Sequence, residues 1–126
     1  MTIHLDTSAL IDSLTGPRRS LDALIALAHE GHRLSLSTIV LYEWLRGPRI
    51  RPELMAQEEL FPRHASSPFG PAQADLAAKL YRSVKKARGR EIDLAVAACA
   101  LSDNAALWTL NRRDFDDIPN LRLIEA

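Results

Sequence analysis

The chain is poor in cysteine and lacks long apolar runs. Its single cysteine, Cys99, excludes an internal disulfide framework. Because Cys99 lies in an apolar stretch of helical character, we expect a buried structural side chain and not a nucleophile. No run reaches the ~18 apolar residues of a membrane span, and residues 1–12 lack a basic segment followed by an apolar core. These absences predict a protein that stays in the cytoplasm.

The chain also has no excess of charge of either sign. Its 16 Lys and Arg residues are balanced by 16 Asp and Glu residues. This balance excludes the strong overall positive field of an obligate nucleic-acid binder, so any contact with a nucleic acid must be local. The 126 residues, 47% of them hydrophobic, suffice for one core. We therefore expect one domain over residues 1–126.

Short β-prone runs alternate with helical segments along the chain. The expected strands are residues 3–5, 33–37, 106–110 and 121–124. The expected helices are residues 9–14, 20–30, 39–46, 52–60, 72–88 and 91–102. Strands separated by helices predict an α/β fold, a three-layer α/β/α sandwich around a mainly parallel sheet of about four strands. The loop over residues 61–71 resembles a domain boundary, but each side alone has too little apolar material for a core.

Four acidic residues stand where folding alone would not favour a charge. Asp6 ends an apolar strand, and Asp93 interrupts an apolar helix. Glu43 lies in the segment 39–46, which is apolar nearly all round and therefore predicts a helix buried on most of its surface. A buried, unpaired carboxylate costs several kcal/mol, so something must compensate for each of these charges. Any one acid alone could pair with an arginine or cap a helix; their joint placement points to a shared site.

The predicted topology brings these acids towards one edge of the sheet. Ligands bind beyond the carboxyl ends of parallel strands, and Asp6 lies at that end of the first strand. Glu43 follows the second strand, Asp114 follows the strand 106–110, and Asp93 lies in the first turn of its helix. Carboxylate clusters suit Mg²⁺ or Mn²⁺, which are used to hydrolyse phosphodiesters. The sequence thus predicts a metal-dependent phosphodiester hydrolase with these four acids as catalytic residues.

The acids stand within four short motifs that together cover the whole chain. The motifs are LDTSALID at residues 5–12, STIVLYEWLRG at 37–47, GREIDLAVAA at 89–98 and LWTLNRRDF at 107–115. In this order they make the chain resemble the PIN-domain family, specifically VapC-type toxin ribonucleases of toxin–antitoxin pairs. Each motif is weak alone, and the ordered set is specific.

The resemblance implies roles for individual residues. Asp6 and Asp93 become the principal ligands of Mg²⁺ (or Mn²⁺), and Glu43 and Asp114 complete the acidic quartet. Two hydroxyls and an amide then support these acids or the water around them: Thr7, Thr109 and Asn111. The position of Asn111 is acidic in some related proteins, which argues against a full second metal site here.

The resemblance also implies partners. It implies an RNA substrate, a homodimer, and a cognate antitoxin whose C-terminal segment covers the acidic pocket. The apolar surface of the segments 72–88 and 91–102 favours the homodimer. The basic segment 46–51 and the cations at Lys85, Lys86, Arg88 and Arg90 are either phosphate contacts or a solvated surface. The four histidines share no motif with the acids, and we expect no catalytic role for them.

The sequence lacks the motifs of two other enzyme classes, whereas one non-enzyme class stays an alternative. A response-regulator receiver domain needs a late lysine, and the last lysine here is Lys86. A haloacid-dehalogenase-type phosphatase needs two Asp residues one position apart after the first strand, and Asp6 is followed by Thr7 and Ser8. The alternative that stays open is a catalytically silent PIN fold that binds RNA or a protein.

Overall fold

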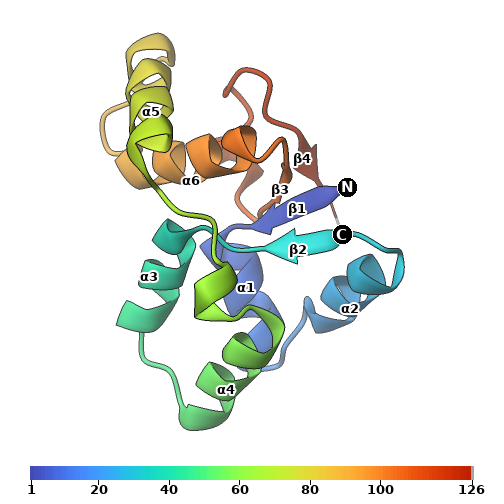
Figure 1. The fold of residues 1–126 in the computed structure, drawn as a ribbon. Helices are drawn as coiled ribbons and strands as arrows, with labels where there is room; N and C mark the ends of the chain where they lie inside the picture. Colours follow the sequence, from blue (N-terminus) through green and yellow to red (C-terminus); the bar gives the residue numbers. More distant parts are fainter. Residues whose placement is uncertain (126) are drawn as a thin grey trace.

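A four-stranded parallel sheet forms the centre of the molecule, in a computed structural model that describes residues 1–125 (Figure 1). The strand order is β2-β1-β3-β4. Ile3 in β1 stands opposite Leu34 on one side and Ala106 on the other, and every strand pair is parallel. The strands are β1 (Thr2–Leu5), β2 (Arg33–Ser35), β3 (Ala106–Trp108) and β4 (Leu123–Ile124).

Helices cover both sides of this sheet, which confirms the predicted α/β/α layers. In Figure 1, α5 and α6 lie above the strands, whereas α1 and α4 lie below them. The helices are α1 (Thr7–Leu14), α2 (Leu21–His29), α3 (Thr38–Arg46), α4 (Arg51–Leu60), α5 (Pro71–Ser83) and α6 (Glu91–Ser102). Two short 3₁₀ turns are η1 (Arg63–Ala65) and η2 (Arg112–Asp114).

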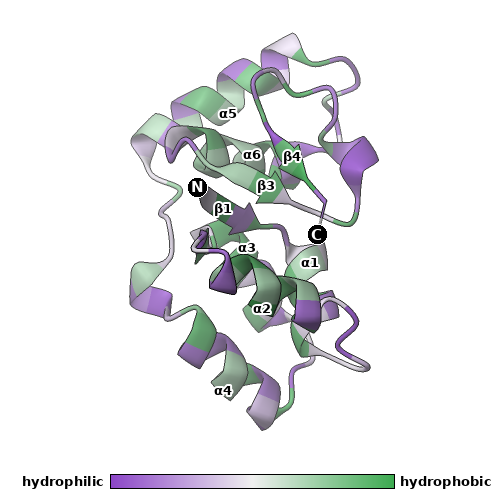
Figure 2. Cartoon of the chain, turned by 90° about the vertical axis from the view of Figure 1, so that its right-hand side faces the viewer, coloured by the Kyte–Doolittle hydropathy of each residue, from purple (hydrophilic) through white to green (hydrophobic). Residues whose placement is uncertain are grey.

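The core is built around α6 and the inner strands. Figure 2 shows hydrophobic residues along α6, β3 and β4, whereas α4 alternates hydrophobic and hydrophilic residues. Residues 94–100 of α6 are all buried, because this helix packs against both α5 and the sheet. Cys99 is fully buried, as predicted, and burial raises the pKa of its thiol to about 11. A thiol so protonated is a structural side chain and not a nucleophile.

The third helix is less buried than its sequence predicts. We expected the segment 39–46 to be covered on most of its surface, and this prediction is wrong. Only Val40 and Trp44 of α3 are buried, whereas Tyr42 is 57% and Leu45 is 36% exposed. The reason is tertiary: the main contacts of α3 are with α1 and α6, and Tyr42 and Leu45 are left exposed by this packing.

Several predicted element ends are also wrong. The helix expected over residues 72–88 ends at Ser83, since Val84 has extended backbone and Lys86 has a φ of 55°. This break lets the chain turn back and bury Ala87 before α6 begins. The strands β2, β3 and β4 are shorter than predicted, whereas β1 is one residue longer. Ser37 instead caps α3, its Oγ accepting from the Val40 N–H at 3.2 Å.

The segment 61–71 adds no fifth strand to the sheet. It contains the η1 turn and then a single parallel bridge between Ser67 and Ser37. The Ser67 N–H donates to the Leu36 carbonyl at 2.8 Å, which fastens the segment to the edge of β2. Within residues 1–125, no helix is long and apolar enough to cross a membrane.

One histidine is part of the interior. His4 in β1 is fully buried, and its Nε2 lies 2.7 Å from Asp103 Oδ2. The same carboxylate oxygen accepts from the Ser67 hydroxyl at 2.7 Å. Burial lowers the pKa of His4 more than the neighbouring Asp103 raises it, so the ring is neutral. The cluster fastens the end of α6 to the sheet and to the segment 61–71, a structural role.

Candidate acidic active site

Asp6 stands at the junction of β1 and α1. Its backbone N–H donates to the Trp108 carbonyl at 2.9 Å, so the pairing of β1 with β3 continues to the first residue beyond the strand. The Asp6 side chain makes no helix-capping bond and is left for other contacts. With Asp6 only 6% exposed, burial raises the pKa of its carboxyl, and hydrogen bonds from Thr109 and Ser8 oppose that rise.

A network of hydroxyl groups holds the Asp6 carboxylate. The Thr109 hydroxyl donates to Asp6 Oδ2 at 2.8 Å, and the Ser8 hydroxyl donates to the same oxygen at 3.1 Å. Backbone N–H groups bond these two hydroxyls in turn, from Asn111 to Thr109 and from Leu110 to Ser8, each at 3.0 Å. Thr109 was predicted from the sequence, but Ser8 was not. The spacing of Ser8 from Asp6 could have indicated this contact, since a hydroxyl two positions from an aspartate commonly bonds to its carboxylate.

Glu43 is held against the start of α1. The Thr7 hydroxyl donates to Glu43 Oε1 at 2.6 Å, and Arg46 Nη2 lies 3.4 Å from Glu43 Oε2. The side chain of Glu43 is 18% exposed. Its negative charge raises the pKa of Asp6, so these two carboxylates lie within electrostatic reach of each other. Thr7 thus orients Glu43, and the residue before it in the sequence, Asp6, is itself one of the acids.

Asp93 has the strongest interaction with the other acids. It lies in the first turn of α6 and is partly buried. Burial raises its pKa to about 6, helped by the negative charges of Asp6, Asp114 and Glu43, and opposed by Arg90. The structure therefore brings all four predicted acids into one electrostatic field, although they come from four different segments of the chain.

Asp114 stands at the exposed side of this group. It ends the η2 turn, and its neighbour Phe115 is 1% exposed, which anchors the loop in the core. The side chain of Asn111 forms no hydrogen bond to another of residues 1–125; its backbone N–H alone joins the hydroxyl network. Asp117 is exposed to solvent, with 42% of its side chain accessible, and it is also paired. Its carboxylate is bound by Arg90 at 2.6 Å, because the chain after η2 folds back towards the start of α6.

The basic segments are partly engaged by the protein itself. Arg49 lies over the Trp44 ring at 4.3 Å and donates from Nε to the Trp44 carbonyl at 3.0 Å. Arg46 lies over Tyr42 at 5.4 Å besides contacting Glu43. In the second segment Lys85, Lys86 and Arg88 are exposed. The segment with Lys85, Lys86 and Arg88 is therefore more accessible to a phosphate group than the segment 46–51.

The donor chemistry of the site suits a hard divalent cation. All the groups are oxygens, either carboxylates or hydroxyls, and the mutual repulsion of the acids is relieved by positive charge. Among residues 1–125, no group of three or more Asp, Glu, His or Cys side chains is placed to hold a metal ion. A divalent cation would therefore be held by at most two of the acids together with water, which is a coordination that Mg²⁺ commonly has.

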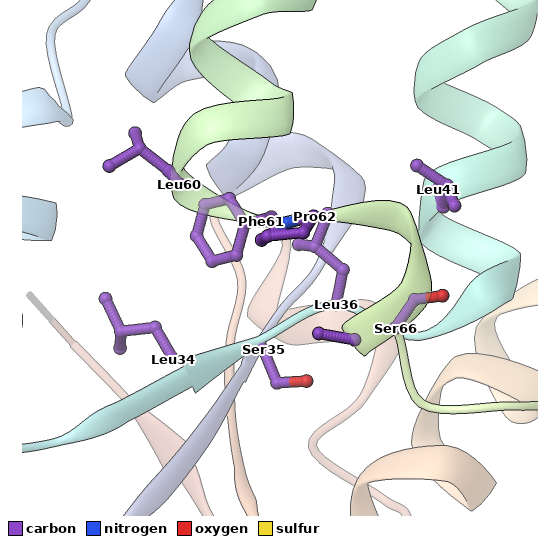
Figure 3. A pocket seen from close by; sticks show the side chains of 9 residues that line it. Leu34, Ser35, Leu36, Leu41, Leu60, Phe61, Pro62 and Ser66 are labelled. Carbon is purple, nitrogen blue, oxygen red and sulfur yellow. The ribbon is translucent and has the colours of Figure 1, made fainter.

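A small pocket elsewhere lacks this chemistry. Figure 3 shows it between β2, the start of α3 and the segment 60–66, with Leu34, Leu36 and Phe61 among its walls. Serine hydroxyls are its polar side chains, and none of the four acids lines it. The acidic group is therefore the better candidate for catalysis, since it carries the titratable side chains.

Relationships to known proteins agree with this geometry. The sequence profile of the PIN domain family matches residues 3–121, and the chain belongs to that family. Within it, the chain is similar to Ribonuclease VapC19 of Mycobacterium tuberculosis, with 30% identity over 120 residues that cover 94% of this chain and 95% of the relative.

Solved structures with the same fold come from VapBC complexes. VapBC2 from Rickettsia felis, bound to a promoter DNA fragment, contains a chain with a TM-score of 0.75 and 22% identity, covering 98% of both chains. DNA-bound VapBC from Salmonella typhimurium has a TM-score of 0.73 and 23% identity, covering 98% of this chain and 97% of the other. These likenesses confirm the PIN-like fold.

Proposed function

We propose that this protein is a metal-dependent endoribonuclease, the toxin of a toxin–antitoxin pair. The observation that carries the proposal is the grouping of Asp6, Glu43, Asp93 and Asp114: burial raises the pKa of Asp93 to about 6, and the negative charges of the other three acids add to that rise. Such mutual repulsion at a sheet edge is typical of functional sites. The name of the relative, a ribonuclease, supports RNA as the substrate. An RNA substrate also places the proposed activity in the cytoplasm.

The four acidic side chains would have different roles in the proposed cleavage of RNA. Asp6 and Asp93 would hold Mg²⁺ or Mn²⁺, with the Asp6 carboxylate oriented by Thr109 and Ser8. When bound, the cation supplies Lewis acidity, which lowers the pKa of water and offsets negative charge on the phosphodiester. Glu43, oriented by Thr7, and the exposed Asp114 would accept hydrogen bonds from water at the site.

Cleavage of RNA with and without divalent cations tests the proposal. The purified chain is expected to cut RNA in Mg²⁺ or Mn²⁺, to stop when EDTA is added, and to resume when Mn²⁺ is restored in excess. A parallel preparation of Asp6→Asn controls for contaminating nucleases. RNA binding without cleavage under every condition would instead support the catalytically silent binding module.

We further propose an antitoxin partner. Two of the similar structures are VapBC complexes, which supports a partner for this chain as well. The chain exposes apolar side chains suited to a protein partner, at Ile25 on α2 and at Met55 and Leu60 on α4. The resemblance to VapC-type toxins further implies that a C-terminal segment of this antitoxin covers the acids.

A homodimer remains part of the proposal, but on different grounds. The apolar surface expected on the segments 72–88 and 91–102 is mostly used within the chain, since residues 94–100 are buried and only Tyr81 and Ile92 stay exposed among the large apolar side chains. Exposed Tyr42 and Leu45 on α3 now carry the argument. Light scattering at micromolar concentration is expected to find a dimer, and Leu45→Glu is expected to weaken it because a charge would be buried at the contact. A wild-type monomer would remove the dimer without affecting the proposed active site.

A further inference from the structure

Arg90 joins two segments that carry acids of the site. Its backbone precedes α6, three positions before Asp93. Its side chain crosses to the loop after β3, where Nη2 donates to the Asp114 carbonyl oxygen at 2.9 Å. The guanidinium also binds both carboxylate oxygens of Asp117, at 2.9 Å from Nη1 and 2.6 Å from Nη2. A further bond, Nη1 to the Lys85 carbonyl at 3.3 Å, reaches the start of the loop between α5 and α6.

This arrangement makes the Arg90 side chain rigid. The side chain is 19% exposed, and both terminal nitrogens are engaged by protein acceptors. A planar guanidinium that binds one carboxylate through two parallel bonds is fixed in orientation as well as in distance. Arg90 is therefore occupied by the protein, in contrast to the exposed Lys85, Lys86 and Arg88 of the same basic segment.

We propose that Arg90 is a positioning residue, which sets the separation of Asp93 and Asp114 by tying the start of α6 to the loop after β3. The inference rests on the proposed function, in which these acids belong to one active site. Phe115 anchors the loop in the apolar core, which also contains residues of α6. Arg90 adds directional ties beside the acids themselves, to the Asp114 carbonyl and to the Asp117 carboxylate.

Kinetics of Arg90→Ala and Asp117→Asn separate positioning from binding of RNA phosphate. Positioning predicts a kcat lower by about 10–100-fold for Arg90→Ala, with little change in KM and a higher requirement for Mn²⁺. Asp117→Asn should lower kcat in the same direction, by about 10-fold, because it weakens the same tie. If Arg90 instead bound phosphate, releasing it from Asp117 would leave kcat unchanged or lower KM, and that result would overturn the proposal.

Matched variants guard against a general loss of structure or charge. Asp116→Asn removes a neighbouring exposed carboxylate, and Lys79→Ala removes an exposed ion pair with Asp75 at 3.0 Å. Both are expected to keep wild-type kinetics. Arg90→Lys keeps the charge but loses the two-pronged geometry, so it should lose most of the kcat that Arg90→Ala loses. Full activity in Arg90→Lys would overturn the proposal.

Hydrogen exchange tests the tie even if the wild-type chain cleaves no RNA, an outcome that would refute the proposed function alone. In the wild type, the Asp114 N–H bonds to the Asn111 carbonyl at 3.0 Å and the Phe115 N–H to the Arg112 carbonyl at 3.0 Å. These two amides are expected to exchange faster in Arg90→Ala and in Asp117→Asn than in Asp116→Asn. Equal exchange in the three variants would overturn the positioning role.

Discussion

Replacing Asp6 by Asn is expected to lower RNA cleavage by about 1,000-fold, which corresponds to about 4 kcal/mol of transition-state stabilisation. Asn keeps the size of the side chain and an oxygen that accepts from Thr109, but it loses the charge that attracts a divalent cation. Because burial and the charge of Glu43 disfavour the Asp6 carboxylate, the metal-free variant should be as stable as the wild type or more so. Single-turnover cleavage at saturating Mn²⁺ and thermal unfolding in EDTA measure the two effects.

The loss of RNA cleavage in two further variants is compared with that in Asp6→Asn. Asp114→Asn should lower cleavage by less than Asp6→Asn, since Asp114 is exposed and lies at the border of the group. Asp116→Asn should stay near the wild type. A strong loss of metal-free stability in Asp6→Asn would contradict the assignment, because it would mean that this carboxylate is a structural partner of Thr109 and Ser8.

Asp93→Asn is expected to stabilise the metal-free protein by about 1–3 kcal/mol near neutral pH and by little at about pH 4. The folded state raises the pKa of Asp93 from 3.8 to about 6. Between these values the folded protein binds more protons than the unfolded chain, so the free energy of unfolding falls as pH rises through this window. Above about pH 6 the ionised Asp93 carboxylate destabilises the folded protein to its full extent. Asn does not titrate, so the variant lacks this destabilisation. Partial solvent screening sets the lower end of the range of about 1–3 kcal/mol.

Urea unfolding of both proteins in EDTA, repeated across this pH range, measures the difference. The buried His4 destabilises both proteins as pH falls below 6.5, because its pKa is lowered in the fold, and this term cancels in the comparison. Asp116→Asn serves as the exposed control and should show no such pH dependence. A difference between Asp93→Asn and wild type that shrinks as pH rises would contradict the electrostatic account.

Much of the candidate site was predictable because strand ends and helix starts are local properties. Asp6 follows the apolar residues 3–5 and precedes Thr7 and Ser8, so its place at a carboxyl strand end follows from neighbouring residues. The partners of these residues could not be read locally, since Thr7 and Glu43 are 36 positions apart and Ser8 and Thr109 are 101 apart.

The sequence alone determined the alternation of strands and helices, the α/β class and the four acids that stand out from apolar surroundings, because hydrophobic periodicity and burial cost act over a few residues. The tertiary structure decided which surfaces stay open and which charges are paired. Tyr42 is exposed although it lies in an apolar helix, because the main contacts of α3 are with α1 and α6. Asp117 is bound to Arg90, 27 positions away, because the loop after β3 returns to α6. Packing between distant segments sets these contacts, and such packing leaves no periodic mark along the chain.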